Sequence, residues 1–209
     1  MSRAALLVVV AACQDSITTP FPEGLEPFDD GPEAAALDAP VAEALVTRST
    51  NDDFIRIYGR GYVFASPAAV YASARDPEVM IAACSTSSQV ITPGTEPQYE
   101  LSFLVHYFVN DILNVEWDDQ WRGSTVTGTL EAPELVALKH QKIEGSDFIT
   151  VSEGTVTIFA TADPGITELQ FVEHLDAVSA STADVLEGMQ HNYDALVASG
   201  HGLGVPPCP

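Results

Sequence analysis

The chain has 209 residues and a formal net charge of −22, with only eight Lys and Arg side chains. This balance argues against nucleic acid as a partner, because such binding rests on cationic contacts to phosphate. It also argues against docking on anionic lipid through a basic patch. The apolar fraction of 46% is ordinary for a globular protein, so we expect a folded core.

Residues 1–13 have the pattern of an export signal. Arg3 precedes the apolar run Ala4–Ala12, which is too short to span a bilayer as a helix but suits the apolar part of a signal peptide. The run ends in Val-Ala-Ala-Cys, which resembles the bacterial lipobox and implies lipidation of Cys13 and cleavage just before it. Gln14, in place of Asp, then implies passage to the outer membrane. A buried strand that contains Cys13 is the alternative.

Two further segments precede the main domain. Residues 14–33 contain four prolines, many acids and no apolar period, which predicts a disordered tether. Within residues 34–53, Leu37, Val41 and Leu45 recur every four residues. That spacing predicts a short helix packed on the domain, followed by a link.

A folded domain is expected over residues 54–209. It begins with a strand of alternating pattern, in which Gly59 and Gly61 weaken the strand unless a bent sheet or a ligand needs the room. Ser66 then stands as an N-cap before a proline, and Pro77 ends or kinks the helix that follows. Two short helices are therefore predicted after the first strand.

Several strands and one long helix complete the predicted domain. Alternating apolar residues mark strands over 99–108, 112–117, 134–143, 154–161 and 166–175. Ser181 and Asp184 resemble a capping box at the start of a helix over Ser181–Ser199. We expect Met189 and Tyr193 of this helix to face the sheet.

This order of elements resembles the START-like (SRPBCC) superfamily, which includes Bet v 1 allergens, lipid-transfer START domains and polyketide cyclases. The most telling stretches are "VFASPAAVYASARDPEVM" (Val63–Met80) and "TELQFVEHLDA" (Thr167–Ala177), the second of which resembles the last strand of the family. The resemblance implies an α+β helix-grip fold, in which a curved antiparallel sheet wraps around a long C-terminal helix.

The resemblance also implies an interior cavity between the sheet and the final helix. The side chains expected to line it are Tyr99, Phe103, Trp117, Leu138, His140, Phe171, Met189 and Tyr193. His140 continues an apolar strand face and is the candidate polar group of the cavity. A fully packed core, with His140 as a satisfied residue at a strand end, is the alternative.

The sequence contains no motif for catalysis, metal binding or a cofactor. The five histidines lack close ligand spacing, and there is no nucleophile elbow, phosphate loop or redox CxxC. The acids Glu116, Asp118 and Asp119 in "NVEWDDQW" do not fit a calcium loop. That stretch is predicted to be a solvated turn between strands.

Three functions are compatible with these patterns. The first is a lipid-anchored envelope protein that binds a hydrophobic small molecule or lipid without catalysis. It would be held through Cys13 at the outer membrane, facing the periplasm or the cell surface. The second is an enzyme similar to a polyketide cyclase or aromatase, with His140 and nearby tyrosines as acid and base. The third is a structural or interaction lipoprotein with a filled core.

Two cysteines remain if Cys13 carries the lipid. Cys84 and Cys208 are then an even pair in an exported protein, where a disulfide can persist. The Gly- and Pro-rich tail that carries Cys208 is long enough to reach back. A disulfide between them is predicted, with two unpaired thiols as the alternative.

Overall fold

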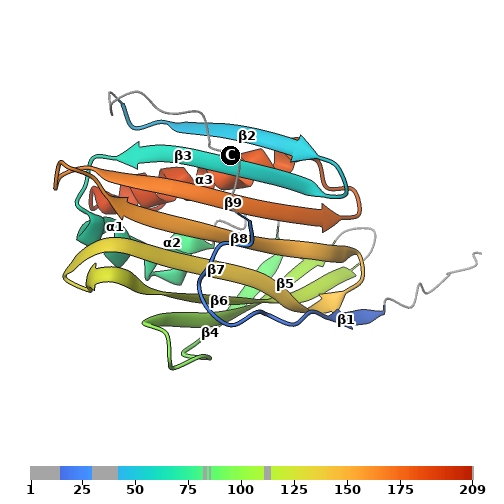
Figure 1. Ribbon diagram of the computed structural model, residues 1–209. Coiled ribbons are helices and arrows are strands. Elements are labelled where there is room, and N and C mark those ends of the chain that lie inside the picture. The colour runs from blue at the N-terminus through green and yellow to red at the C-terminus, as the bar shows by residue number, and fades with distance from the viewer. Residues whose placement is uncertain (1–14, 30–41, 82–83, 85, 111–113, 209) are drawn as a thin grey trace, which may run out of the picture.

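The computed structural model describes residues 15–29, 42–81, 84, 86–110 and 114–208 (Figure 1). The strands are β1 (Ser16–Thr18), β2 (Leu45–Asn51), β3 (Ile55–Val63), β4 (Ser88–Pro93), β5 (Leu101–Asn110), β6 (Asn114–Thr129), β7 (Ala132–Ser146), β8 (Ile149–Ala160) and β9 (Thr167–Ala177). The helices are α1 (Pro67–Ala74), α2 (Pro77–Met80) and α3 (Thr182–Gly200). Among the described residues, no helix combines the length and apolar character needed to cross a bilayer.

The strands form one antiparallel sheet with the order β2-β3-β9-β8-β7-β6-β5-β4, and β1 pairs with β7 beside this path. Figure 1 shows α3 lying along one face of the sheet, with α1 and α2 on the same side. The buried apolar side chains of the sheet point toward these helices. The predicted α+β helix-grip architecture, with two short helices after a strand and a long C-terminal helix, is confirmed.

The glycines of β3 give α3 the room to approach the sheet. A Cβ added at Gly59 would lie 2.7 Å from Sδ of Met189, and one at Gly61 would lie 2.7 Å from Cε2 of Tyr193. The hydroxyl of Tyr193 also donates a hydrogen bond of 2.6 Å to the carbonyl oxygen of Tyr62. Both α3 side chains are buried, as the sequence predicts. The helix, and not a ligand, occupies the room that the two glycines leave.

The helices begin where their capping residues place them. The Ser66 hydroxyl accepts a hydrogen bond from the backbone N–H of Ala69, and a proline follows at the first helical position of α1. At the start of α3, Ser181 and Asp184 form a reciprocal capping box. These local signals explain why both helices begin as predicted.

The prediction of a disordered tether is wrong over Asp15–Asp29. β1 extends the sheet beside β7, and the rest of this segment lies on the outer face of the sheet. The Phe21 ring lies 3.6 Å from the guanidinium carbon of Arg122, and the Phe28 ring lies 4.0 Å from Nζ of Lys139. Cation–π contacts of this kind order a segment that otherwise has the composition of a linker. The remainder of the predicted tether lies outside the described residues.

The predicted helix within residues 34–53 is also wrong where it can be compared. Leu45 begins strand β2, in which Leu45 stands opposite Gly61 of β3. The β-branched residues Val46, Thr47 and Thr50 favour a strand, and the free edge of β3 supplies the partner. Leu37 and Val41 lie outside the described residues.

Candidate functional site

A cavity of about 250 Å³ lies between the concave face of the sheet and the N-terminal half of α3. Its walls come from β5, β6, β7, β8, β9, α3 and the stretch that follows α2. They consist of Met80, Ile81, Thr86, Tyr107, Trp117, Asp119, Trp121, His140, Ser152, Val156, Phe171, Glu173, Leu175, Asp184, Val185, Gly188, Met189 and Asn192. Most of this surface is apolar or aromatic, with a few ionisable groups among it.

Three ionisable side chains meet on one wall of the cavity. Nε2 of His140 lies 3.1 Å from a carboxylate oxygen of Glu173, and its Nδ1 lies 3.9 Å from a carboxylate oxygen of Asp119. The imidazole stacks on the Trp121 ring with 4.2 Å between centroids, which fixes the plane of the ring. Tyr107 and Trp117 stack in the same way at 4.8 Å. The aromatic rings thus form a rigid frame around a charged cluster.

Burial and neighbouring charges shift the pKa values of two members of this cluster, Asp119 and His140. Burial raises the pKa of Asp119 to about 7, although the charge of His140 and a hydrogen bond from Trp117 oppose the rise. Burial by itself lowers the pKa of His140, but the charges of Glu173 and Asp119 and the hydrogen bond to Glu173 outweigh it, so that the pKa is raised. Burial also raises the pKa of Tyr107 well above its usual value, which keeps the phenol neutral. A buried carboxyl that can take up or lose a proton near pH 7 is typical of functional sites.

Gly154 of β8 makes the room in which this cluster forms. A Cβ added there would lie 2.3 Å from Oε2 of Glu173 and 2.5 Å from Nε2 of His140. These distances are far below van der Waals contact, so any larger residue would separate the imidazole from its carboxylate. The close pair of His140 and Glu173 therefore depends on a glycine in the neighbouring strand.

Four of the eight predicted cavity residues line the cavity, namely Trp117, His140, Phe171 and Met189. They belong to β6, β7, β9 and α3, which explains why strand alternation could place them together. Their role in binding stays a prediction.

The other four predicted residues lie elsewhere. Phe103 and Leu138 are wholly buried in the packed core, and Tyr193 packs over β3. Tyr99 precedes β5 and lies toward the N-terminal segment, where its hydroxyl accepts a hydrogen bond from the backbone N–H of Gly24. It was expected on the same face as Phe103, but the strand begins only at Leu101.

Two acids of the site were not predicted from the sequence. The stretch expected to be a solvated turn lies within β6, and its Asp119 is only 5% exposed. Glu173 is an acid on the inward face of β9, between Phe171 and Leu175. Alternation could have found both: Asp119 has the same parity as Trp117, and Glu173 the same parity as its apolar neighbours.

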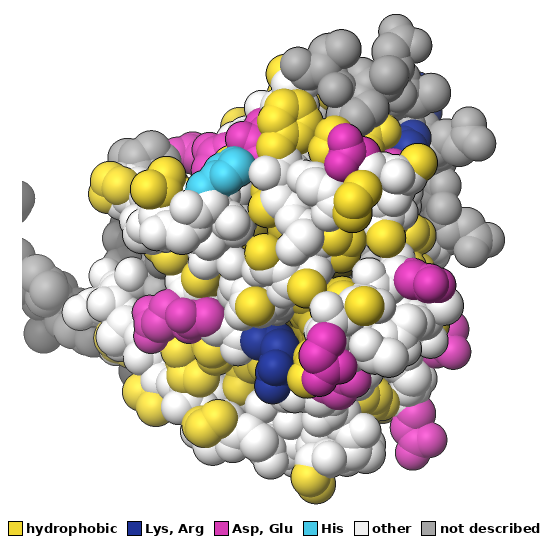
Figure 2. Space-filling view, turned by 90° about the vertical axis from the view of Figure 1, so that its left-hand side faces the viewer, with side chains coloured by type: hydrophobic (Ala, Val, Ile, Leu, Met, Phe, Trp, Pro, Cys, Tyr) yellow, Lys and Arg dark blue, Asp and Glu magenta, His cyan; other side chains and the backbone are white. Residues whose placement is uncertain are grey.

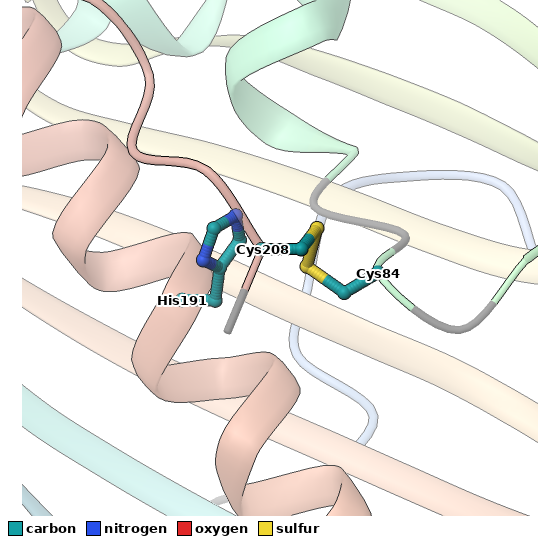
Figure 3. A group of neighbouring side chains, drawn as sticks. All are labelled: Cys84, His191 and Cys208. Carbon is teal, nitrogen blue, oxygen red and sulfur yellow. A yellow bond between two sulfur atoms is a disulfide. The ribbon is translucent and has the colours of Figure 1, made fainter.

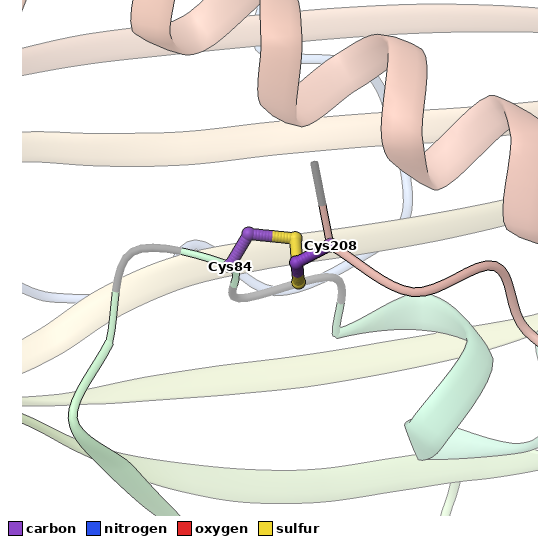
Figure 4. Close-up of a disulfide and its surroundings, with 2 residues drawn as sticks. All are labelled: Cys84 and Cys208. Atoms are coloured by element: carbon purple, nitrogen blue, oxygen red, sulfur yellow. A yellow bond between two sulfur atoms is a disulfide. The ribbon is translucent and has the colours of Figure 1, made fainter.

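The predicted disulfide between Cys84 and Cys208 is present, with 5.4 Å between the α-carbons (Figure 4). It joins the C-terminal tail to the stretch between α2 and β4. His191 of α3 lies beside it (Figure 3), and the three potential ligand atoms are all within 4.8 Å of one another. Because metal binding needs thiolates and these sulfur atoms are bonded to each other, the group acts as a structural bridge.

No protein-family model matches the sequence, and no curated protein is significantly similar to it. Solved structures are similar in fold. The human StarD13 (DLC2) lipid transfer and protein localization domain has 13% identity and a TM-score of 0.51, and the match covers 81% of this chain and 88% of that domain. Human STARD10 has 11% identity and a TM-score of 0.52, with 80% and 75% covered. The chain therefore has the START-like helix-grip fold.

Proposed function

We propose that this chain binds a small, mostly apolar molecule that carries an uncharged polar group, and that it does so as a lipid-anchored protein of the bacterial envelope. The cavity supports the proposal that the chain binds a small molecule, because its aromatic walls surround a buried cluster of ionisable side chains. The fold supports it: the similar StarD13 domain is described as a lipid transfer domain.

The size of the cavity limits the ligand. Its volume of about 250 Å³ lies just below the range of roughly 300–1,000 Å³ that is usual for small-molecule pockets. A fused ring system or a short chain fits this space, but the two acyl chains of a phospholipid do not. The proposed ligand is therefore smaller than a whole membrane lipid.

The polar atoms of the wall set the chemistry of the ligand. Nε1 of Trp121, Nδ1 of His140 and Oδ1 of Asp119 are buried without a hydrogen-bond partner among the residues that the structure describes. A buried polar atom without a partner is costly, so a ligand that reaches these atoms gains by satisfying them. A hydroxyl or carbonyl oxygen can do so, whereas a carboxylate would meet the acidic side chains of Glu173 and Asp119, and Asp119 also becomes negative as the pH rises through about 7.

Calorimetric titration with 2-naphthol and with 2-naphthoate tests this proposal. We expect 2-naphthol to bind and 2-naphthoate to bind more weakly, since only the first is neutral. His140→Leu should weaken binding of 2-naphthol, and His106→Leu, which changes an exposed histidine on the outer face, should not. Equal binding of the two probes, or no loss with His140→Leu, would contradict the proposed ligand chemistry.

Proton-transfer catalysis is a second candidate, favoured by one observation. Asp119 and His140 both lie at the cavity wall, and the raised pKa of Asp119 allows it to donate or accept a proton near pH 7. An enzyme of this kind would exchange protons on a carbon next to a bound carbonyl. Deuterium uptake by 2-tetralone in heavy water measures this directly: acceleration by the parent protein and not by Asp119→Asn would support catalysis, and no acceleration would oppose it.

The envelope anchor rests on the Val-Ala-Ala-Cys ending at Cys13. We expect the thiol of Cys13 to carry a diacylglyceryl group after export, with the protein held at the outer membrane. Cys13→Ser should leave the precursor unprocessed and stop labelling with a clickable palmitate analogue in a bacterial host. Unchanged labelling of this variant would exclude the anchor.

A further inference from the structure

The cavity opens at one end of the sheet. Its half-buried or exposed lining residues include Trp117 early in β6, Ser152 early in β8, Leu175 late in β9 and Asp184 in the first turn of α3. In an antiparallel sheet with this register, these positions all lie at the same end. We call it the mouth end, defined by the turn between β7 and β8 and the connection between β9 and α3.

The N-terminal segment is fixed at this same end. The backbone N–H of Asp147, in the turn between β7 and β8, donates a hydrogen bond of 3.0 Å to the carbonyl oxygen of Asp15. Ser16 stands opposite Ser146 in the pairing of β1 with β7. From there the segment runs away from the mouth end, and the N–H of Thr19 donates to the next part of β7. In Figure 1 β1 lies at the end of the sheet where β7 and β8 are joined by this turn.

The chain length between Asp15 and Cys13 is short. Two residues span at most about 7 Å at ~3.3–3.6 Å per residue. A lipid on Cys13 would thus lie close to the mouth end, and the paired β1 gives the domain no long tether on which to turn away. We propose that the mouth end lies against the lipid bilayer, so that the cavity opens toward the membrane and not toward bulk water. This inference rests on the proposed lipid anchor.

The surface of the mouth end fits lipid headgroups that carry no net charge. Val178 is 70% exposed at the connection between β9 and α3, and its N–H donates to the carbonyl oxygen of Phe148 in the neighbouring turn. An apolar tip beside a covalent lipid adds to membrane affinity. The carboxylates of Asp147, Asp176 and Asp184 lie at or near this end and would be repelled by anionic lipid. We therefore expect contact with zwitterionic lipid.

Apolar exposure alone does not decide the orientation. Val126 is 54% exposed near the turn between β6 and β7, at the opposite end of the sheet. Figure 2 shows that end of the molecule, where acidic side chains stand in separate groups and few basic ones are visible. The position of Asp15 is what distinguishes the two ends.

Chemical coupling to vesicles tests the orientation. With the Cys84–Cys208 disulfide closed, Cys13 is the remaining cysteine of the chain and couples to a maleimide lipid in phosphatidylcholine vesicles. Trp121→Phe leaves Trp117, at the mouth, as the single tryptophan. Brominated phosphatidylcholine then reports proximity by quenching its emission. The matched control carries Cys13→Ser and Asp163→Cys, which moves the coupling to the turn between β8 and β9 at the opposite end.

We expect strong quenching after coupling through Cys13 and little after coupling at residue 163. Equal quenching in both, or stronger quenching in the control, would overturn the proposal. Should Trp121→Phe fail to fold, the protein with both tryptophans gives the same comparison. Because the coupling is chemical, the result does not depend on whether a cell lipidates Cys13, which the palmitate labelling tests separately.

Discussion

Replacement of Asp119 by Asn probes the buried cluster most directly. The folded chain keeps the Asp119 proton up to about pH 7, whereas an unfolded carboxyl releases it at about pH 3.9. The unfolded chain thus binds fewer protons over this range, and the free energy of unfolding falls as the pH rises. At ~1.4 kcal/mol for each pH unit, the parent protein should lose about 3 kcal/mol between pH 5 and pH 8 from this group.

Asp119→Asn removes that loss, because an amide does not ionise. We expect the variant to gain about 3 kcal/mol relative to the parent between pH 5 and pH 8. Urea unfolding followed by tryptophan fluorescence at both pH values measures the difference. Asp118→Asn is the matched control: its carboxylate contacts His106 on the outer face, where a surface pair contributes below ~1 kcal/mol. The reasoning would be refuted if the free energies of unfolding of Asp119→Asn and the parent differed by the same amount at pH 5 and at pH 8.

Three further substitutions test the packing around the cavity. Met189→Asp should destabilise the fold by ~3 kcal/mol by burying a charge, and Gln190→Asp on the exposed side of the helix should cost far less; equal thermal melts would rule out the packing of α3. Gly154→Ala should lower the free energy of unfolding by ~1–3 kcal/mol through overpacking. Gly188→Ala has open space around it and should raise the free energy of unfolding by ~1 kcal/mol. The reverse order of stability in urea unfolding would contradict the steric explanation. Cys208→Ser should cost up to ~4–5 kcal/mol in the chain-entropy view of a long closed loop, and an unchanged melt would show that the disulfide does not constrain the unfolded chain.

The elements of the domain were largely predictable because their signals are local. Ser66 and Ser181 cap their helices, and strict alternation marks the inward faces of the strands. The N-terminal segment was not predictable in this way. The Phe21 ring packs on the guanidinium of Arg122, which lies about 100 residues away in the sequence. A contact over that separation leaves no local pattern in a single amino-acid sequence. Composition correctly identified a polar segment but could not show the cations that order it.

Part of the candidate site was predictable from the alternation of residues along its strands. Alternation placed His140 and Trp117 on inward faces, and both line the cavity. Asp119 was assigned to a solvated turn because it belongs to a stretch with three acids that does not fit a calcium loop. Its parity with Trp117 pointed inward, but the aromatic rings that stack around it come from β5, β6 and β7, and only the folded sheet shows that they enclose the carboxyl.

Native mass spectrometry of the protein purified from its own host tests the proposed binding function most directly. We expect one small organic molecule per chain, with a mass that suits a cavity of about 250 Å³. Leu175→Trp at the cavity mouth should abolish the adduct, and Val90→Trp, at an exposed position of edge strand β4, should retain it. A chain that carries no adduct, or the same occupancy in the Leu175→Trp variant, would contradict the claim that this cavity binds a small molecule.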